Sequence, residues 1–473
     1  VPLCASGRPA PAGHQRRWRT PLRQRAACAS GPPATMAYPS APAGAVVACT
    51  AAAVMVYARW RRRRREQHQR RVLVVGSINV DLYQRTVAGA VRFSGKPVDV
   101  RPLKGMTLPA SSFVAHPKMA SQPGVASRYV AGEEEAFLLT MDGPFEQKTG
   151  GKGANAAAAA AQTFACELYA NLGSASATEN GALTRDLAAF GGVGTRHVLT
   201  LEGRPTGTAY ILLFDDNDNA IVLLGGANQA WPPATELERE GGALHAAVAR
   251  AEAVMLQREV PPYVNRAAAK LARSLGVPVF MDVGGTDAPL DEELMPYLDV
   301  VAPNESELAF ISGVEIPRDD HARCDLHLVR RAVGALKDKF ARHGAEVEVL
   351  VTLGAQGSLH FGASWREGGV TSGRGGEGVM SRGGGGEGAT PMGRFALNTP
   401  DGKPRDTTGA GDCYRGSYVA MRYGEGRSIA EAMRWAAAAA ACSVEVEGAM
   451  PSMPTRAAIA QRYAQPLLPL AHL

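Results

Sequence analysis

Short apolar runs alternate along the chain with segments whose apolar residues recur at helical spacing. The first run is β-branched, begins at Arg71 and ends in Gly76-Ser77. Similar runs follow at Ala253–Leu256, Val277–Asp282, Val300–Ala302 and Val347–Leu353. Helical patterns such as Tyr263–Leu275 lie between them. Buried strands that alternate with helices indicate right-handed βαβ crossovers. The pattern therefore predicts an α/β fold with a largely parallel central sheet.

Three segments depart from this alternation. Thr208–Phe214 and Ala220–Leu224 flank a turn of Asp and Asn residues, which predicts a β-hairpin. Residues 82–148 are rich in Gly, Pro, Ser and charge, and predict short strands with irregular insertions. Residues 362–393 are dominated by glycine, and we interpret them as a flexible surface insertion.

The N-terminal part has the composition of a leader. Residues 1–65 contain twelve Arg and no Asp or Glu, which is typical of an organellar transit peptide. Within it, the uncharged residues 41–58 precede a basic run, so a membrane anchor with a cytosolic basic flank is an alternative. We predict a leader over 1–70, a folded domain over 71–464 and a tail over 465–473. The alternatives for localisation are a plastid or mitochondrion, the cytoplasm, and a membrane anchor facing the cytosol.

Charge and cysteine content exclude several classes of protein. Removing the twelve leader arginines from the total of 51 Lys and Arg leaves 39 basic residues against 45 acidic ones, a net charge of −6. An acidic body argues against a nucleic-acid partner. The seven cysteines are scattered without a Cys-x-x-Cys pair, which argues against a zinc site or a disulfide framework.

The stretch Asp406-Thr407-Thr408-Gly409-Ala410-Gly411-Asp412 is the strongest candidate for chemistry. Backbone N–H groups of a glycine turn at a helix start form a site for a phosphate or a developing anion. An aspartate at that helix start can accept a proton from an alcohol that attacks phosphorus. On local pattern alone, an ordinary capped helix with an acid in its first turn is an equal alternative.

Three further motifs accompany this stretch. Gly150-Gly151-Lys152-Gly153-Ala154-Asn155 opens an alanine-rich helix, and it is not a P-loop because Gly153 stands where Ser or Thr is required. Asn79 and Asp81 follow the first strand, and Asn304 and Glu307 follow a later one. Ligands bind at the carboxyl ends of strands in such sheets, although Asn and Asp are also common in turns.

Together these motifs resemble the ribokinase-like (PfkB) carbohydrate kinase family over about residues 71–464. The resemblance implies a three-layer α/β/α sandwich with a small β lid over the sugar. It implies a base, Asp412, and an anion hole made by the backbone of Thr408, Gly409, Ala410 and Gly411. The sugar-binding residues that it implies, besides Asp412, are Asn79, Asp81, Gly151, Lys152, Gly153, Ala154, Asn155 and Glu259.

The resemblance also implies ATP, Mg²⁺ and K⁺. The nucleotide would contact Asn304, Thr352, Leu353, Gly354, Ala355, Gln356, Gly357, Gly411, Asp412 and Ala437. Glu307 would help hold Mg²⁺ through water. The K⁺ ligands would be Asp406, Thr408, Ser443, Val446, Gly448 and Ser452, mostly through backbone oxygens.

The activity implied is ATP-dependent phosphorylation of the 5-hydroxyl of D-ribose, in ribose catabolism. Fructose, a nucleoside or a keto-sugar acid as substrate, and a kinase-derived scaffold without catalysis, are the alternatives. The resemblance further implies a homodimer through the lid. Two departures from the family pattern bear on this: Met106 replaces an acid in the lid, and Cys413-Tyr414-Arg415-Gly416-Ser417 replaces the usual residues after the base.

Overall fold

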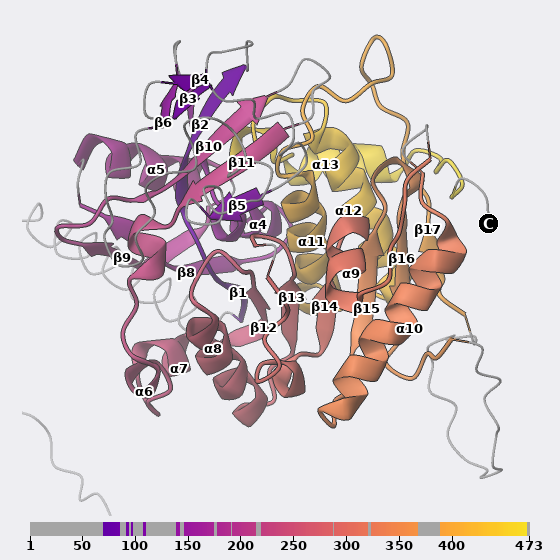
Figure 1. Ribbon diagram of the computed structural model, residues 1–473, viewed down its shortest axis with the longest axis horizontal. Helices are drawn as coiled ribbons and strands as arrows, with labels where there is room; N and C mark the ends of the chain where they lie inside the picture. Colours follow the sequence, from indigo (N-terminus) through magenta and orange to yellow (C-terminus); the bar gives the residue numbers. More distant parts are fainter. Residues whose placement is uncertain are drawn as a thin grey trace, which may run out of the picture. The chain divides into compact units, whose positions relative to one another are not determined.

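A central sheet of nine strands organises the domain (Figure 1). The computed structural model describes residues 70–85, 91–93, 96–97, 107–109, 139–141, 146–174, 177–190, 192–213, 219–286, 288–319, 323–367 and 388–470. The strands lie in the order β17 (Thr390–Met392), β16 (Ser358–Phe361), β15 (Glu348–Thr352), β14 (Val300–Ala302), β13 (Val279–Asp282), β12 (Ala251–Leu256), β1 (Arg71–Val75), β8 (Cys166–Gly173) and β9 (Gly194–Leu201). Neighbours from β9 to β15 pair in parallel, whereas β16 and β17 are antiparallel. The prediction of a largely parallel sheet is confirmed.

Helices cover both faces of this sheet, because neighbouring strand residues point to opposite sides. Leu73 and Val75 of β1 pack in one apolar cluster, and Val72 and Val74 pack in another. The first cluster includes residues of α6 (Ala234–Leu237), α7 (Ala243–Val248), α8 (Pro262–Ser274), α9 (Glu305–Ser312) and α10 (Leu326–Arg342). The second includes residues of α4 (Lys152–Ala161), α5 (Ala177–Ala189), α11 (Ala410–Val419), α12 (Ile429–Ser443) and α13 (Arg456–Tyr463). The fold is the expected three-layer α/β/α sandwich.

Single 3₁₀ or π turns connect some of these elements. They are η2 (Gly226–Gln229), η3 (Met295–Tyr297), η4 (Gly354–Gln356), η5 (Ala420–Gly424) and η6 (Met450–Ser452).

A second, smaller sheet forms the predicted lid. Its five strands lie in the order β5 (Thr107–Pro109), β11 (Asn219–Leu224), β10 (Gly207–Leu213), β2 (Asn79–Arg85) and β7 (Glu146–Gly150). β10 and β11 form the antiparallel hairpin that the sequence predicts. β2 follows β1 after three residues, so Asn79 and Asp81 lie on a lid strand rather than in a turn. β3 (Val91–Phe93), β4 (Lys96–Pro97) and β6 (Leu139–Met141) form a separate three-stranded sheet.

The alanine run of α4 is explained by close helix packing. α4 packs against α11, and Ala156–Ala160 are all buried. A Cβ on Gly416 of α11 would lie 2.4 Å from the carbonyl oxygen of Ala156, so only glycine fits there. Small residues on both helices therefore bring together the two elements that carry Lys152, Asn155 and Asp412.

The extent predicted for the glycine-rich insertion is wrong at its C-terminal end. Residues 390–392 of the range 362–393 form β17, which pairs with β16. Thr390-Pro391-Met392 interrupts the glycine-rich composition, and Met392 is buried, so three residues suffice for an edge strand. Residues 1–69, Met106 and residues 368–387 lie outside the described residues. Within the described part of the chain, no helix combines the length and apolarity needed to cross a membrane.

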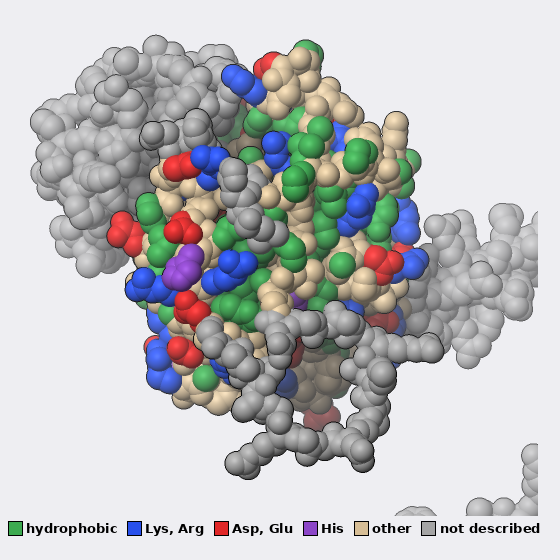
Figure 2. Space-filling model, turned by 90° about the vertical axis from the view of Figure 1, so that its right-hand side faces the viewer, with side chains coloured by type: hydrophobic (Ala, Val, Ile, Leu, Met, Phe, Trp, Pro, Cys, Tyr) green, Lys and Arg blue, Asp and Glu red, His purple; other side chains and the backbone are tan. Residues whose placement is uncertain are grey.

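Charges of both signs are mixed on the described surface that Figure 2 shows. Lys and Arg side chains lie among Asp, Glu, apolar and uncharged polar ones on this face (Figure 2). Nucleic-acid binding relies on basic side chains gathered on one face. The mixture on this face is therefore that of an ordinary solvated surface.

Lys337 of α10 should be a large contributor to stability. Its side chain is buried, and Nζ donates to the carbonyl oxygens of Val347 at 2.5 Å, Gly362 at 2.7 Å and Ala363 at 2.9 Å. Lys337→Met leaves these acceptors without their donor, so we expect a loss of about 2–4 kcal/mol in the free energy of unfolding. Urea denaturation measures it. Lys270→Met is the matched control, because Lys270 forms an exposed pair with Glu238, and a change below about 0.5 kcal/mol is expected there. Equal effects of the two substitutions would refute the role of Lys337.

Candidate active site

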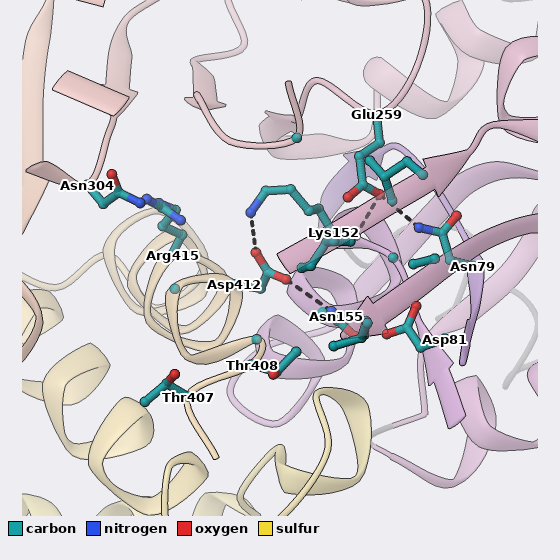
Figure 3. Close-up of a pocket in the computed structure, with 18 of the residues that line it drawn as sticks. Asn79, Asp81, Lys152, Asn155, Glu259, Asn304, Thr407, Thr408, Asp412 and Arg415 are labelled. Carbon is teal, nitrogen blue, oxygen red and sulfur yellow. Dashed lines mark hydrogen bonds and ion pairs between the residues drawn. The ribbon is translucent and has the colours of Figure 1, made fainter. Parts of the chain in front are cut away.

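A pocket lies where the lid faces the carboxyl ends of the central strands. The lid supplies Asn79, Asp81, Ala209, Ile211, Ile221 and Leu223 to its lining. The rest of the chain supplies Gly151, Lys152, Asn155, Glu259, Gly285, Asn304, Glu307, Thr407, Thr408, Gly409, Gly411, Asp412 and Arg415. Figure 3 shows Asp412 and Lys152 between two groups of side chains, with Asn79, Asp81 and Glu259 on one side and Asn304 and Arg415 on the other. The structure thus brings residues from both ends of the domain into one site.

Glu259 organises a polar wall that joins the segment after β1, the start of β2 and the glycine motif. Its Oε2 accepts hydrogen bonds from Ser77 Oγ at 2.6 Å, from Asn79 Nδ2 at 3.2 Å and from the backbone N–H of Lys152 at 3.2 Å. Burial raises its pKa, and the hydrogen bond from Ser77 opposes that shift. Asn79 is fixed at its other end, because Asn228 Nδ2 donates to Asn79 Oδ1 at 2.7 Å. These side chains are held by one another before any ligand arrives.

Asp81 carries the least stabilised carboxylate of this wall. It is 4% exposed, and its Oδ1 is buried with no hydrogen-bond partner among the described residues. Burial raises its pKa well above the ordinary value, and the carboxylates of Glu259 and Asp412 raise it further. A buried acceptor without a hydrogen-bond partner is stabilised by any hydroxyl group that donates to it.

Asp412 lies in the first turn of α11, at the helix end where anions are stabilised. Gly409 precedes the helix with φ of 74°, a left-handed conformation that favours glycine. Lys152 Nζ lies 2.6 Å from Asp412 Oδ1, and Asn155 Nδ2 donates to Oδ2 at 3.0 Å. The carboxylate is therefore oriented by two residues of α4, with the backbone of Gly409–Gly411 beside it.

Asp412 belongs to a largely buried network of two cations, Lys152 and Arg415, and three carboxylates. Lys152 also pairs with Asp282 at 3.0 Å, and Arg415 pairs with Asp282 at 3.4 Å and with Glu307 at 3.2 Å. Burial lowers the pKa of Lys152, but Asp282 and Asp412 outweigh it and the pKa lies above its ordinary value. Burial raises the pKa of Asp282, but Arg415 and Lys152 outweigh it and the pKa is lowered. For Glu307 burial prevails over Arg415, and the pKa is raised.

Asn304 and Glu307 cap α9 reciprocally. Asn304 Oδ1 accepts from the N–H of Glu307, and Glu307 Oε2 accepts from the N–H of Asn304, both at 2.8 Å. Asn304 also bridges to Thr352 at the end of β15, which leads into Leu353–Gly357. The side chains of Leu353 and Gln356 face the interior: Leu353 is buried, and Gln356 bonds the backbone of Cys324. Of the predicted nucleotide contacts, Thr352, Leu353, Gly354, Ala355, Gln356, Gly357 and Ala437 do not line this pocket.

Three of the predicted cation ligands, Asp406, Thr408 and Gly448, are joined by hydrogen bonds. Asp406 Oδ1 accepts from the N–H of Thr408, and its Oδ2 accepts from the N–H of Gly448, both at 2.8 Å. The N–H of Arg405 donates to the carbonyl oxygen of Val444, which joins the same two segments. Asp406 therefore connects the loop after Ser443 to the start of the glycine turn at residues 408–411, the anion turn.

Comparison with known proteins identifies the family. Residues 140–456 match the family model described as pfkB family carbohydrate kinase. The chain belongs to this family. Both the predicted family and the predicted fold class are confirmed.

The chain is similar to known ribokinases over about two thirds of its length. It is 33% identical over 318 residues to ribokinase of Arabidopsis thaliana, covering 66% of this chain and 70% of that protein. It is 31% identical over 308 residues to ribokinase of Haemophilus influenzae, covering 65% of this chain and 84% of that protein. The solved structure of Arabidopsis thaliana ribokinase complexed with ribose and ATP has 28% identity and a TM-score of 0.59, and covers 84% of this chain and 100% of that one.

Sequence reasoning missed two members of the charged network, Asp282 and Arg415, as functional residues. Asp282 ends β13, where the rule that ligands bind at strand ends could have selected it. Arg415 lies three residues after Asp412 on α11, and helical spacing places the two on one face. The apolar residues Ala209, Ile211, Ile221 and Leu223 of the hairpin were also not predicted to line the site.

Proposed function

We propose that the chain is an ATP-dependent sugar kinase that phosphorylates the 5-hydroxyl of D-ribose. The observation that carries the proposal is the position of Asp412, at the start of α11 between the polar wall and the Asn304 side of the pocket. A carboxylate there can accept a proton from a hydroxyl while the adjoining N–H groups stabilise the transferred phosphoryl group. The similarity to ribokinases, one of them solved with ribose and ATP, supports this substrate pair.

The sugar would occupy the space between the lid and α4. Asn79, Asp81 and Glu259 offer one amide and two carboxylates at fixed positions, which suits the several hydroxyl groups of a small sugar. Ala209, Ile211, Ile221 and Leu223 provide an apolar lid surface that excludes water. In this arrangement the hydroxyl that reacts donates to Asp412, whose carboxylate oxygens can each accept a second hydrogen bond beside those from Lys152 and Asn155.

In phosphoryl transfer the protein mainly positions the reactants and stabilises the charge of the transition state. We infer that Asp412 takes the hydroxyl proton and that the backbone of Gly409, Ala410 and Gly411 receives the γ-phosphoryl oxygens. We expect Lys152 Nζ, which pairs with both Asp412 and Asp282, to lie beside the transferred group. The nucleotide would extend from this point past Asn304 toward Thr352 and the turn Gly354–Gly357.

The residues present fit both metal ions that the family implies. Glu307 and Asp282 are oxygen donors beside the pocket, a set suited to Mg²⁺, which would neutralise phosphate charge when bound. Asp406 would hold K⁺ through its hard carboxylate oxygens, with the implied backbone oxygens of Ser443, Val446, Gly448 and Ser452 completing the set. A cation there would brace the loop under the anion turn and contact no substrate.

The test is an assay of the purified full-length chain with ATP, Mg²⁺ and a panel of sugars and nucleosides. We expect D-ribose to give the highest kcat/KM. Replacing K⁺ with tetramethylammonium should lower the rate, because that ion is too large for a carbonyl cage. No turnover on any acceptor would refute the enzyme and favour a scaffold. A higher kcat/KM for fructose or a nucleoside would refute only the substrate, and an unchanged rate without K⁺ would refute the cation site.

Assembly and localisation stay predictions. We propose a homodimer through the lid, which light scattering of the purified protein tests: a monomer mass would refute it. We propose that residues 1–70 direct the chain to a plastid or mitochondrion, which a fluorescent fusion of these residues tests. A reporter at a membrane facing the cytosol would instead support the anchor at residues 41–58.

A further inference from the structure

Arg415 is a buried cation to which neither the proposed proton transfer nor the proposed sugar contacts assign a role. Its side chain is 3% exposed, yet it lines the pocket. It lies on α11 three residues after Asp412. Its Nη1 lies 3.4 Å from Asp282 Oδ1, and its Nη2 lies 3.2 Å from Glu307 Oε2.

The guanidinium lies against the turn that would receive the phosphoryl group. A Cβ placed on Gly411 would be 2.7 Å from Arg415 Nη1, so this nitrogen packs over the backbone of the helix start. In Figure 3 Arg415 lies beside Asn304, across Asp412 from Asn79 and Asp81. The side chain is thus on the part of the pocket assigned to the nucleotide, not to the sugar.

The ion pairs leave donors of the guanidinium unfilled. Arginine carries five N–H donors in a fixed fork, and Arg415 Nε is buried with no hydrogen-bond partner in the described structure. A role as counter-ion for Asp282 and Glu307 would explain the two Nη contacts but not the free Nε. Phosphate oxygens match the arginine fork, and a buried donor without a partner gains most from a charged acceptor.

We propose that Arg415 binds the terminal phosphates of the nucleotide, an inference that rests on the proposed kinase function. The phosphate oxygens accept hydrogen bonds from those guanidinium N–H groups that have no acceptor in the nucleotide-free protein. They also compete with Glu307 for Nη2, so nucleotide binding loosens the pair between Arg415 and Glu307. The site then uses one arginine for two purposes: it neutralises two carboxylates in the free protein and holds polyphosphate in the complex.

The test compares nucleotides that differ only in phosphate number. Dissociation constants for ATP, ADP and AMP are measured by calorimetry, with EDTA present so that no metal contributes. For Arg415→Gln we expect ATP affinity to fall by about 10–100-fold and AMP affinity by less than about 3-fold, because charge-assisted bonds to the outer phosphates are lost. Arg422→Gln is the matched control, since Arg422 bonds the backbone of Arg427 beyond α11, and all three constants should stay unchanged.

Each outcome decides something. Equal ATP affinity in wild type and Arg415→Gln overturns the inference, and so does an equal loss for ATP and AMP, which assigns Arg415 a purely structural role. If the wild type itself binds no ATP, the proposed function fails first. Arg415→Gln could fail to fold, because Asp282 and Glu307 lose their counter-ion. In that case the double variant Arg415→Gln/Glu307→Gln, which removes one negative charge together with the positive one, is compared with Glu307→Gln. The same differences in ATP and AMP affinity are then expected.

Discussion

Replacing Asp412 with asparagine is expected to lower kcat by about 10³-fold or more while ATP affinity stays within a few-fold of wild type. The substitution keeps the shape of the side chain and removes its capacity to accept a proton. Asp412 is the carboxylate that lies in the first turn of α11 and lines the pocket, and the proposed mechanism brings the sugar hydroxyl and the phosphoryl group together there. The proposed nucleotide contacts at Asn304, Thr352 and Arg415 are not altered by the substitution.

The measurement is a steady-state assay with saturating ATP, together with ATP binding by calorimetry. Asp401→Asn is the matched control: it is the same substitution at an exposed position before the anion turn, and should leave kcat unchanged. An amide at position 412 must turn its NH₂ toward either Lys152 or Asn155, both of which now donate to the carboxylate. A melting temperature is therefore recorded for each variant. A folded Asp412→Asn protein that keeps more than about a tenth of the wild-type kcat would refute the base.

Much of the fold follows from residue pattern because the central strands are covered on both faces. Strands in that position are apolar along most of their length, so Val72–Val75 and Ala253–Leu256 stand out as runs. The prediction of a flexible insertion over residues 362–393 was wrong at its C-terminal end for the opposite reason. β17 is a short edge strand with one buried apolar residue, Met392, and too little pattern to detect.

The active site was predictable only as far as its motifs are local. Asn79, Asp81, Lys152, Asn155 and Asp412 belong to short stretches whose chemistry is visible in sequence, and the structure places them in one pocket. The partners that orient them come from distant segments. Asn228 bonds Asn79 from 149 residues away, and Arg415 joins Glu307 from 108 residues away. No local spacing encodes such pairs, because the fold alone brings the segments together.

The second large effect is expected at Asp81, where stability and function should move in opposite directions. Asp81→Asn is expected to lower kcat/KM for the sugar by about 10²–10⁴-fold, because a charged acceptor for a buried hydroxyl is replaced by a neutral amide. The same substitution should raise the melting temperature of the sugar-free protein by about 2–5 °C at pH 8. The gain arises because the carboxylate is buried beside Glu259 and Asp412 with Oδ1 unpaired.

The pH dependence of that gain separates electrostatics from packing. The pKa of Asp81 is raised in the folded protein, so the folded chain holds this proton more tightly than the unfolded chain does. The cost of ionising the group is therefore absent below its ordinary pKa, grows as the pH rises, and is complete above the raised pKa. The difference in melting temperature between Asp81→Asn and wild type should be largest at pH 8 and shrink as the pH falls toward 4.

The control is Asp291→Asn, the same change at a partly exposed carboxylate that pairs with Arg266 at 2.7 Å outside the pocket. It should lower the melting temperature slightly at pH 8 and leave kcat/KM unchanged. A destabilised Asp81→Asn protein, or a gain that does not change with pH, would mean that Asp81 is satisfied in the free state. An unpaired Asp81 carboxylate would then not be what favours binding of a sugar hydroxyl at the lid. A gain in stability with full activity would instead remove Asp81 from the sugar site.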